Sequence, residues 1–242
     1  MSNAAKMKSK IELLLAKAEG TDNDHERDAY TAKAQRLMLE WGIAEADLES
    51  RGEVKPETVV QVVREFRGQY SMAMGPFAHR VALGMGNVKT IKAGKAARWW
   101  VYAVGHQTDV DNFWMMMDSL ERQALAALKV WWSTTPDRQW LDTSTEQWKA
   151  RRQFILSFGA TVGQRLDALR EEVQEDATPG AALVLVSKIE RVQSEYENLH
   201  PEAKASRGLS GGAAGHKAGT EAGRRAHLGG KAVGTGTAGA LR

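Results

Sequence analysis

The spacing of apolar residues near the N-terminus predicts two helices that pack against each other. Residues 7–19 place their apolar side chains on one stripe, and residues 25–41 repeat this helical spacing. A short polar turn separates the two segments, so they are expected to form an antiparallel hairpin. Gly42 stands where a left-handed cap would end the second helix. The polar stretch 49–57 contains Gly and Pro and is predicted to be a linker.

The pattern then changes to one that favours short strands around a helix. Residues 58–66 are rich in β-branched side chains and are predicted to form a strand. A helix is expected over residues 74–85. Residues 87–92 and 98–104 look like two strands joined by a tight turn. Thr108 is the expected N-cap of a long helix whose apolar stripe continues to about residue 132.

The second half of the chain predicts one more long helix. A polar loop at 133–145 leads into a helical pattern over 146–174, and a helix is also expected at 188–198. The apolar run 182–186 is interpreted as a buried strand added to the sheet. The predicted fold class is α+β, in which a small antiparallel sheet is packed by two long helices. The expected units are a helical hairpin at 1–50, an α+β domain at 51–205 and a Gly-rich basic tail at 206–242.

Composition excludes several classes of chemistry. The chain has no cysteine, which excludes disulfides, cysteine nucleophiles and thiolate metal sites. It has no apolar run long enough to span a membrane, and its N-terminus lacks the apolar core of a signal peptide. We therefore expect no membrane partner and a location in the cytoplasm.

Charge is distributed unevenly although the net charge is only +3. Residues 51–105 and 201–242 carry net charges of +6 and +5, whereas residues 1–50 and 106–200 carry −3 and −5. Two interpretations are open. The blocks can complement each other within the molecule, or the basic blocks can together form a surface for a polyanion.

Four cations beside two tryptophans make residues 89–100 a candidate nucleic-acid site. The residues are Lys89, Lys92, Lys95, Arg98, Trp99 and Trp100. Cations and aromatic rings on a β-hairpin suit phosphate contact and base stacking. Because neighbouring strand residues point to opposite faces, one of the two tryptophans is expected to be exposed. The alternative is that Trp99 or Trp100 faces the core and the lysines only solubilise an edge strand.

The Gly-rich tail has glycines at a spacing of four, which places them on one helix face; they are Gly211, Gly215, Gly219 and Gly223. The tail also carries basic residues that would add phosphate contacts, namely Lys217, Arg224 and Arg225. Two alternatives compete with binding. The tail can be disordered, or it can form a helix packed against a neighbouring helix or a second subunit.

The sequence assigns no catalytic residue, no metal ligand and no cofactor. No zinc-protease motif, nucleophile elbow or phosphate loop is present. His106, Asp109 and Asp111 are close enough in sequence to hold a cation. Acidic residues in the first turn of a helix are, however, also typical of simple dipole stabilisation.

Several segments resemble a family of bacteriophage and prophage proteins. The segments at 10–19, 28–38 and 41–43 resemble an N-terminal helical domain of unknown function. The rest is similar to the second, uncharacterised domain that usually follows it, through degenerate motifs that begin at Val104, Ser119, Phe154, Ala182 and Gly219. The resemblance implies a phage-encoded protein and no particular activity.

These observations favour a non-enzymatic, phage-encoded protein that binds nucleic acid in DNA metabolism or host takeover. Two alternatives stay open. The acidic hairpin and the tryptophans around the loop 133–145 suit a protein-interaction module that inhibits a host factor or takes part in phage assembly. A cation-dependent hydrolase would use His106, Asp109 and Asp111.

Overall fold

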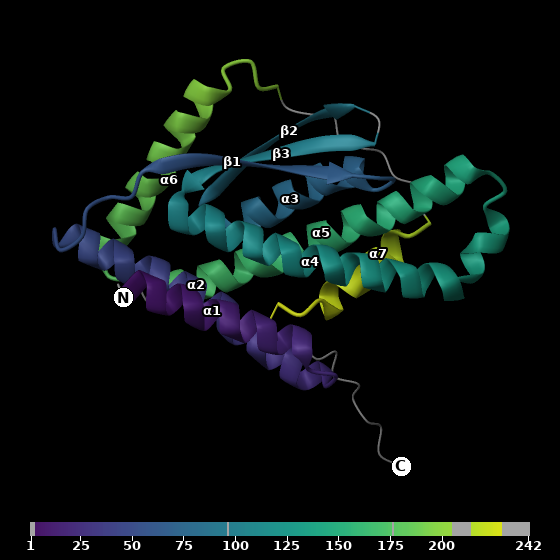
Figure 1. The fold of residues 1–242 in the computed structure, drawn as a ribbon, viewed down its shortest axis with the longest axis horizontal. Coiled ribbons are helices and arrows are strands. Elements are labelled where there is room, and N and C mark those ends of the chain that lie inside the picture. The colour runs from purple at the N-terminus through teal and green to yellow at the C-terminus, as the bar shows by residue number, and fades with distance from the viewer. Residues whose placement is uncertain (1–2, 96, 176, 205–213, 229–242) are drawn as a thin grey trace, which may run out of the picture.

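A computed structural model describes residues 3–95, 97–175, 177–204 and 214–228 and confirms the α+β fold class (Figure 1). In chain order its elements are α1 (Asn3–Gly20), α2 (Asp24–Ser50), β1 (Val59–Arg67), α3 (Ser71–Met85), β2 (Val88–Lys95), β3 (Arg98–His106), α4 (Gln107–Thr134), the 3₁₀ helix η1 (Pro136–Trp140), α5 (Ser144–Gln174), α6 (Pro179–Leu199) and α7 (His216–Arg225). No helix in the described part of the chain is long and apolar enough to cross a membrane.

The three strands form one antiparallel sheet in the order β1-β3-β2. Its inner face packs on α3 and α4, and α6 covers one end of the outer face (Figure 1). The middle strand shows this division by alternation, because Val101 and Ala103 are fully buried on the inner face. The outer face away from α6 is therefore left open to solvent.

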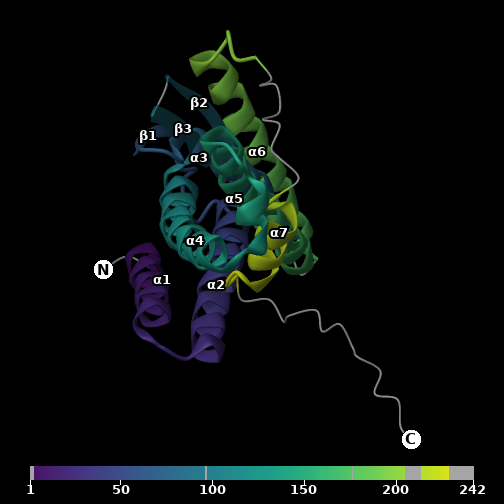
Figure 2. The ribbon, with the colours of Figure 1, turned by 90° about the vertical axis from the view of Figure 1, so that its right-hand side faces the viewer.

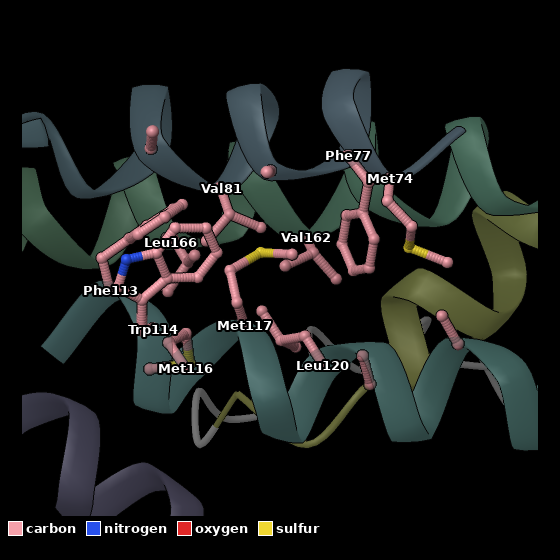
Figure 3. Packing of buried hydrophobic residues seen from close by; sticks show 14 of the residues in the cluster. Met74, Phe77, Val81, Phe113, Trp114, Met116, Met117, Leu120, Val162 and Leu166 are labelled. Atoms are coloured by element: carbon pink, nitrogen blue, oxygen red, sulfur yellow. The ribbon is translucent and has the colours of Figure 1, made fainter. Parts of the chain in front are cut away.

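The core lies between the sheet-facing helix α3 and the long helices α4 and α5. Figure 3 shows Met74, Phe77 and Val81 of α3 pointing toward Met117 and Leu120 of α4. Val162 and Leu166 of α5 fill the same layer (Figure 3). Buried side chains of α1 and α2 continue this cluster without a break. The N-terminal hairpin is therefore packed onto the rest of the molecule.

Helix α5 packs against two neighbours at backbone distance, because glycines replace side chains at both contacts. Toward α3, a Cβ atom on Gly84 would lie 2.8 Å from the Leu166 side chain and closer still to the Gly163 carbonyl. Toward α7, a Cβ on Gly223 would lie 2.8 Å from the Phe158 carbonyl, and one on Gly219 would overlap the Phe154 carbonyl. Only glycine permits such an approach.

Within the described residues, the tail forms a packed helix, which was one of the two alternatives to direct binding. Gly219 and Gly223 lie on helix α7, which packs on α5 of the same chain, and Gly215 is the left-handed residue directly before α7 (Figure 2). The glycine face predicted as a possible oligomer contact is thus used within the molecule. Gly211 lies outside the described residues, as does most of the remaining tail.

Helix α2 is longer than predicted, since it continues through Gly42 to Ser50. The left-handed glycine occurs at Gly52, with φ of 73°. There the amide of Glu53 donates to the Leu48 carbonyl and the amide of Gly52 donates to the Glu49 carbonyl, which is a Schellman ending. The expected cap at Gly42 was wrong because the additional turns pack on α6 and bury Ala46.

The strand predicted at residues 182–186 is wrong, because these residues belong to helix α6. Thr178 caps the helix by accepting from the Ala181 amide, and Pro179 occupies its first position. The apolar run is not buried as a strand would require, since Leu183 is 72% exposed and Val186 is 55% exposed.

Helix α4 begins one residue after β3, and its expected cap at Thr108 is also wrong. Thr108 lies inside the first turn, where its hydroxyl donates to Glu57 over 2.6 Å. The Glu57 carboxylate also accepts from the Thr108 amide over 3.3 Å. A carboxylate from the segment before β1 therefore takes the place of the expected cap.

Candidate nucleic-acid interface

The pairing register places three cations in one row across the open face of the sheet. Arg98 on β3 lies opposite Arg67 on β1 and opposite Lys95 on β2. All three residues are exposed. Like charges directly opposite each other destabilise a sheet, so this row requires negative charge nearby. Sequence reasoning missed Arg67, because its position beside Arg98 follows only from the strand register.

The next two rows of the same face carry aromatic and apolar side chains. Trp100 lies between Glu65 and Ala93, and both Trp100 and Tyr102 are partly exposed. Tyr102 lies between Val63, which is 49% exposed, and Ile91. We call the surface formed by Arg67, Lys95, Arg98, Trp100 and Tyr102 the open sheet face.

Glu65 partly balances the cation row. Its carboxylate accepts from Arg98 over 2.5 Å and from Arg67 over 2.6 Å. These two hydrogen bonds lower the pKa of Glu65 to about 2. The Arg98 guanidinium also lies 5.4 Å from the Trp100 ring centroid. With three cations and one carboxylate, the open sheet face stays net positive at any pH where Glu65 is ionised.

Helix α6 limits the open sheet face at its far end. The His200 ring, directly after α6, lies 5.9 Å from the Tyr102 ring and hydrogen-bonds to Gln61 over 2.6 Å. Lys89 pairs with Val104, so it lies on the outer face in the row that α6 covers. Lys89 is therefore at the border of the candidate interface.

Lys92 and Trp99, two of the predicted site residues, belong to the inner face. Lys92 pairs with the buried Val101. Its aliphatic stem packs closely over Gly75 of α3, so that a Cβ atom on Gly75 would lie 2.6 Å from the Lys92 side chain. Burial lowers the pKa of Lys92, whose amine lies 5.7 Å from the Trp99 ring. The structure therefore groups Lys95, Arg98 and Trp100 and separates them from Lys92 and Trp99.

The basic residues of the tail do not join this face. Lys217, Arg224 and Arg225 lie on α7, which packs against α5 on another side of the molecule (Figure 2). Arg225 and Arg224 both pair with Glu221, over 2.9 Å and 3.6 Å. The two basic blocks of the sequence are thus separate surfaces in the described part of the chain.

The three residues considered for a cation are also divided. His106 and Asp109 line a cavity between α2, α6 and the start of α4. Asp111 instead pairs with Lys8 of α1 over 2.7 Å. Within the described residues, no group of three His, Cys, Asp or Glu side chains is placed to hold a metal ion.

The tryptophans near the loop mostly complete the packing of α4 and α5. Trp131 stacks on Phe154 with 5.2 Å between ring centroids, and the Trp148 indole donates to the Gln69 carbonyl over 3.1 Å. Trp140 differs from them, since it is 77% exposed.

The comparisons with known proteins identify only the N-terminal hairpin. Residues 6–45 match the family described as a protein of unknown function (DUF2786), so the chain carries a DUF2786 domain made of α1 and most of α2. No curated protein matches the chain. No solved structure matches it either.

Proposed function

We propose that the protein binds single-stranded nucleic acid on the open sheet face. The observation that carries this proposal is the cross-strand arrangement of Arg67, Arg98 and Lys95 beside Trp100 and Tyr102. A nucleic-acid strand running along β3 would stack its bases on Trp100 and Tyr102 and bring its phosphates to the cation row at the end of these strands. Stacking on aromatic side chains needs unpaired bases, which favours single strands over duplex.

The geometry of β3 supports this orientation. Trp100 and Tyr102 are two residues apart on the same strand and so lie on one face, roughly 7 Å from each other. That spacing suits bases that are spread along a backbone and stacked one per ring. The phage setting, with a role in DNA metabolism or host takeover in the host cytoplasm, belongs to the same proposal and rests on the sequence resemblance.

The test is a fluorescence-anisotropy titration of single-stranded DNA and RNA oligonucleotides at two salt concentrations. Three phosphate contacts predict that the logarithm of the association constant falls with that of the salt concentration with a slope of about −2. Trp100→Ala should weaken binding by about 5- to 150-fold, since one stacked base contributes roughly 1–3 kcal/mol.

Two neighbouring lysines give a matched control. Lys95→Gln removes a cation from the open sheet face and should weaken binding and flatten the salt slope. Lys92→Gln removes the same charge from the inner face and should change binding little. Glu65→Gln should strengthen binding because it frees both arginines. Equal effects of the two lysine changes, or full binding by Trp100→Ala, would contradict the proposal.

A further inference from the structure

A cavity of about 250 Å³ lies at the end of the sheet where α2, α6 and the first turn of α4 meet. Its wall on the α2 and α6 side is apolar, with Met38, Ile43, Leu185 and Ile189. The opposite wall is polar and comes from the turn before β2, the end of β3 and the start of α4. Ile189 is 39% exposed at its edge, so the cavity has a route to solvent.

The polar wall contains hydrogen-bond acceptors that the protein leaves unused. His106 is only 1% exposed, and its Nδ1 lies 3.0 Å from the Glu57 carbonyl. Because a carbonyl only accepts, Nδ1 carries the ring proton. Burial, together with the charges of Lys188 and Arg191, lowers the His106 pKa against the opposing backbone carbonyls of Glu57 and Lys188. The lowered pKa favours the neutral ring, and the geometry leaves its Nε2 buried without a hydrogen-bond partner.

Asn87 and Asp109 add further acceptors beside this nitrogen. The Asn87 amide nitrogen donates to Asp109 over 2.6 Å, which leaves the Asn87 Oδ1 buried and unpartnered. Asp109 retains an oxygen that this bond does not use. Buried polar atoms without partners are rare in folded proteins and cost free energy. Such acceptors around a cavity indicate a ligand that brings its own donors.

The charges around the cavity argue against a metal ion as that ligand. Lys188 is 6% exposed and faces the cavity, where it pairs with Glu45 over 3.6 Å. Arg170 also lines the cavity. Among the residues that line the cavity, the two cations Lys188 and Arg170 outnumber the one carboxylate, Asp109, which disfavours a divalent cation and favours a neutral donor.

We propose that this cavity binds a small planar heterocycle that presents two or more N–H donors, of nucleobase size. The N–H groups would meet His106 Nε2, Asn87 Oδ1 and the Asp109 carboxyl, while the ring would lie against the apolar wall. The volume is below the roughly 300–1,000 Å³ typical of sites for drug-sized molecules, which limits the ligand to about one ring system. This proposal does not rest on nucleic-acid binding by the open sheet face.

The experiment uses free 2-aminopurine, adenine and cytosine as probes, with caffeine as a planar molecule that has no N–H group. Binding to the full chain is followed by 2-aminopurine fluorescence, by competition with the other bases and by thermal shift. We expect saturable binding of the N–H probes and none of caffeine. At pH 8, where the Asp109 carboxylate is ionised, Asp109→Asn should weaken binding about ten-fold, because it replaces an acceptor by a donor.

Matched variants separate this cavity from other effects. Asp111→Asn changes the same residue type two positions along α4 but outside the cavity, and should leave binding unchanged. Ile189→Trp should block the cavity, whereas Leu183→Trp on the exposed side of α6 should not. Trp100→Ala should bind the probes normally even if it no longer binds oligonucleotides.

Three outcomes would overturn the proposal. The first is no saturable binding of any N–H probe at millimolar concentration. The second is equal binding of caffeine, which would show that the acceptors do not select the ligand. The third is stabilisation by Mg²⁺, Mn²⁺ or Zn²⁺ that Asp109→Asn removes, which would assign the cavity to a cation.

Discussion

At the level of single residues, the direction of each strand side chain decides which predicted site residues act together. Alternation correctly placed Trp99 and Trp100 on opposite faces, but it gave no means of telling which face is open. That depends on α3, whose Gly75 leaves room for the Lys92 stem on the inner face of the sheet.

The acceptors of the cavity were partly predictable, since the sequence indicates His106 and Asp109 as candidate site residues. Asn87 was not, because it reaches Asp109 only through the fold.

Asp109 should make the stability of the protein depend on pH. Desolvation raises its pKa from 3.8 to about 7, with Glu57 and Glu45 adding to the shift and Lys188 and the Asn87 hydrogen bond opposing it. The folded state thus binds this proton more tightly than the unfolded state, so stability falls as pH rises from about 4 to 7. A shift of this size corresponds to about 4 kcal/mol at most.

The measurement is urea unfolding of the natural protein and of Asp109→Asn at pH 5 and pH 8. Asparagine keeps the oxygen that accepts from Asn87 and never ionises. The free energy of unfolding of the variant minus that of the natural protein should therefore be larger at pH 8 than at pH 5, by a few kcal/mol. Titration of His106 occurs in both proteins and cancels in the difference. A difference that does not change with pH would show that Asp109 is ionised normally.

At the level of elements, local signals identified most helices and strands but failed where packing decides. The run at 182–186 has the composition of a buried strand, yet Thr178, Pro179 and contacts with α2 make it a helix. Arg191 and Lys188 pair with Glu49 and Glu45 across that contact. These long-range ion pairs leave no short-range trace in the sequence.

The glycines of α5 and α7 should tolerate no added methyl group. Gly219→Ala would place its Cβ against the Phe154 backbone, which cannot move aside as a flexible side chain can. We expect a loss of about 1–3 kcal/mol, as for other overpacked contacts. Gly42→Ala on α2 meets no atom within 4 Å, and should add about 0.5–1 kcal/mol.

Chemical denaturation measures both changes, and hydrogen exchange locates them. Exchange in Gly219→Ala should increase first at residues 214–228. If the two alanine variants shift stability in the same direction, the close contact between α5 and α7 is wrong.

At the level of the whole molecule, the structure separates the two basic blocks and packs the N-terminal hairpin onto the rest of the chain, neither of which the sequence indicates. The basic blocks lie on separate surfaces, so the polyanion surface that combined them is not formed by the described residues. The hairpin is connected to the rest through Lys8 with Asp111 and Arg36 with Glu172, and through Gln35 against Met116. The units proposed at 1–50, 51–205 and 206–242 remain a prediction about folding autonomy.

The shared core predicts that the hairpin unfolds together with the sheet. Ile11 is 2% exposed in the cluster that also contains Phe113 and Leu120. Ile11→Ala should cost about 2–5 kcal/mol, and hydrogen exchange should rise in β3 as well as in α1. Leu13→Ala is a matched control, because Leu13 is 57% exposed on the same helix. Faster exchange confined to residues 3–50 would instead show an independent hairpin.

The packing of α7 on α5 also has a consequence for association between copies of this protein. Because the contact uses bare backbone, a chain whose own α7 has been displaced presents a groove that accepts the same helix from another chain without any new chemistry. Exchange of α7 between two copies would therefore re-form the same contact in a dimer. A single methyl group on α7 would block that exchange as effectively as it blocks the contact within one chain.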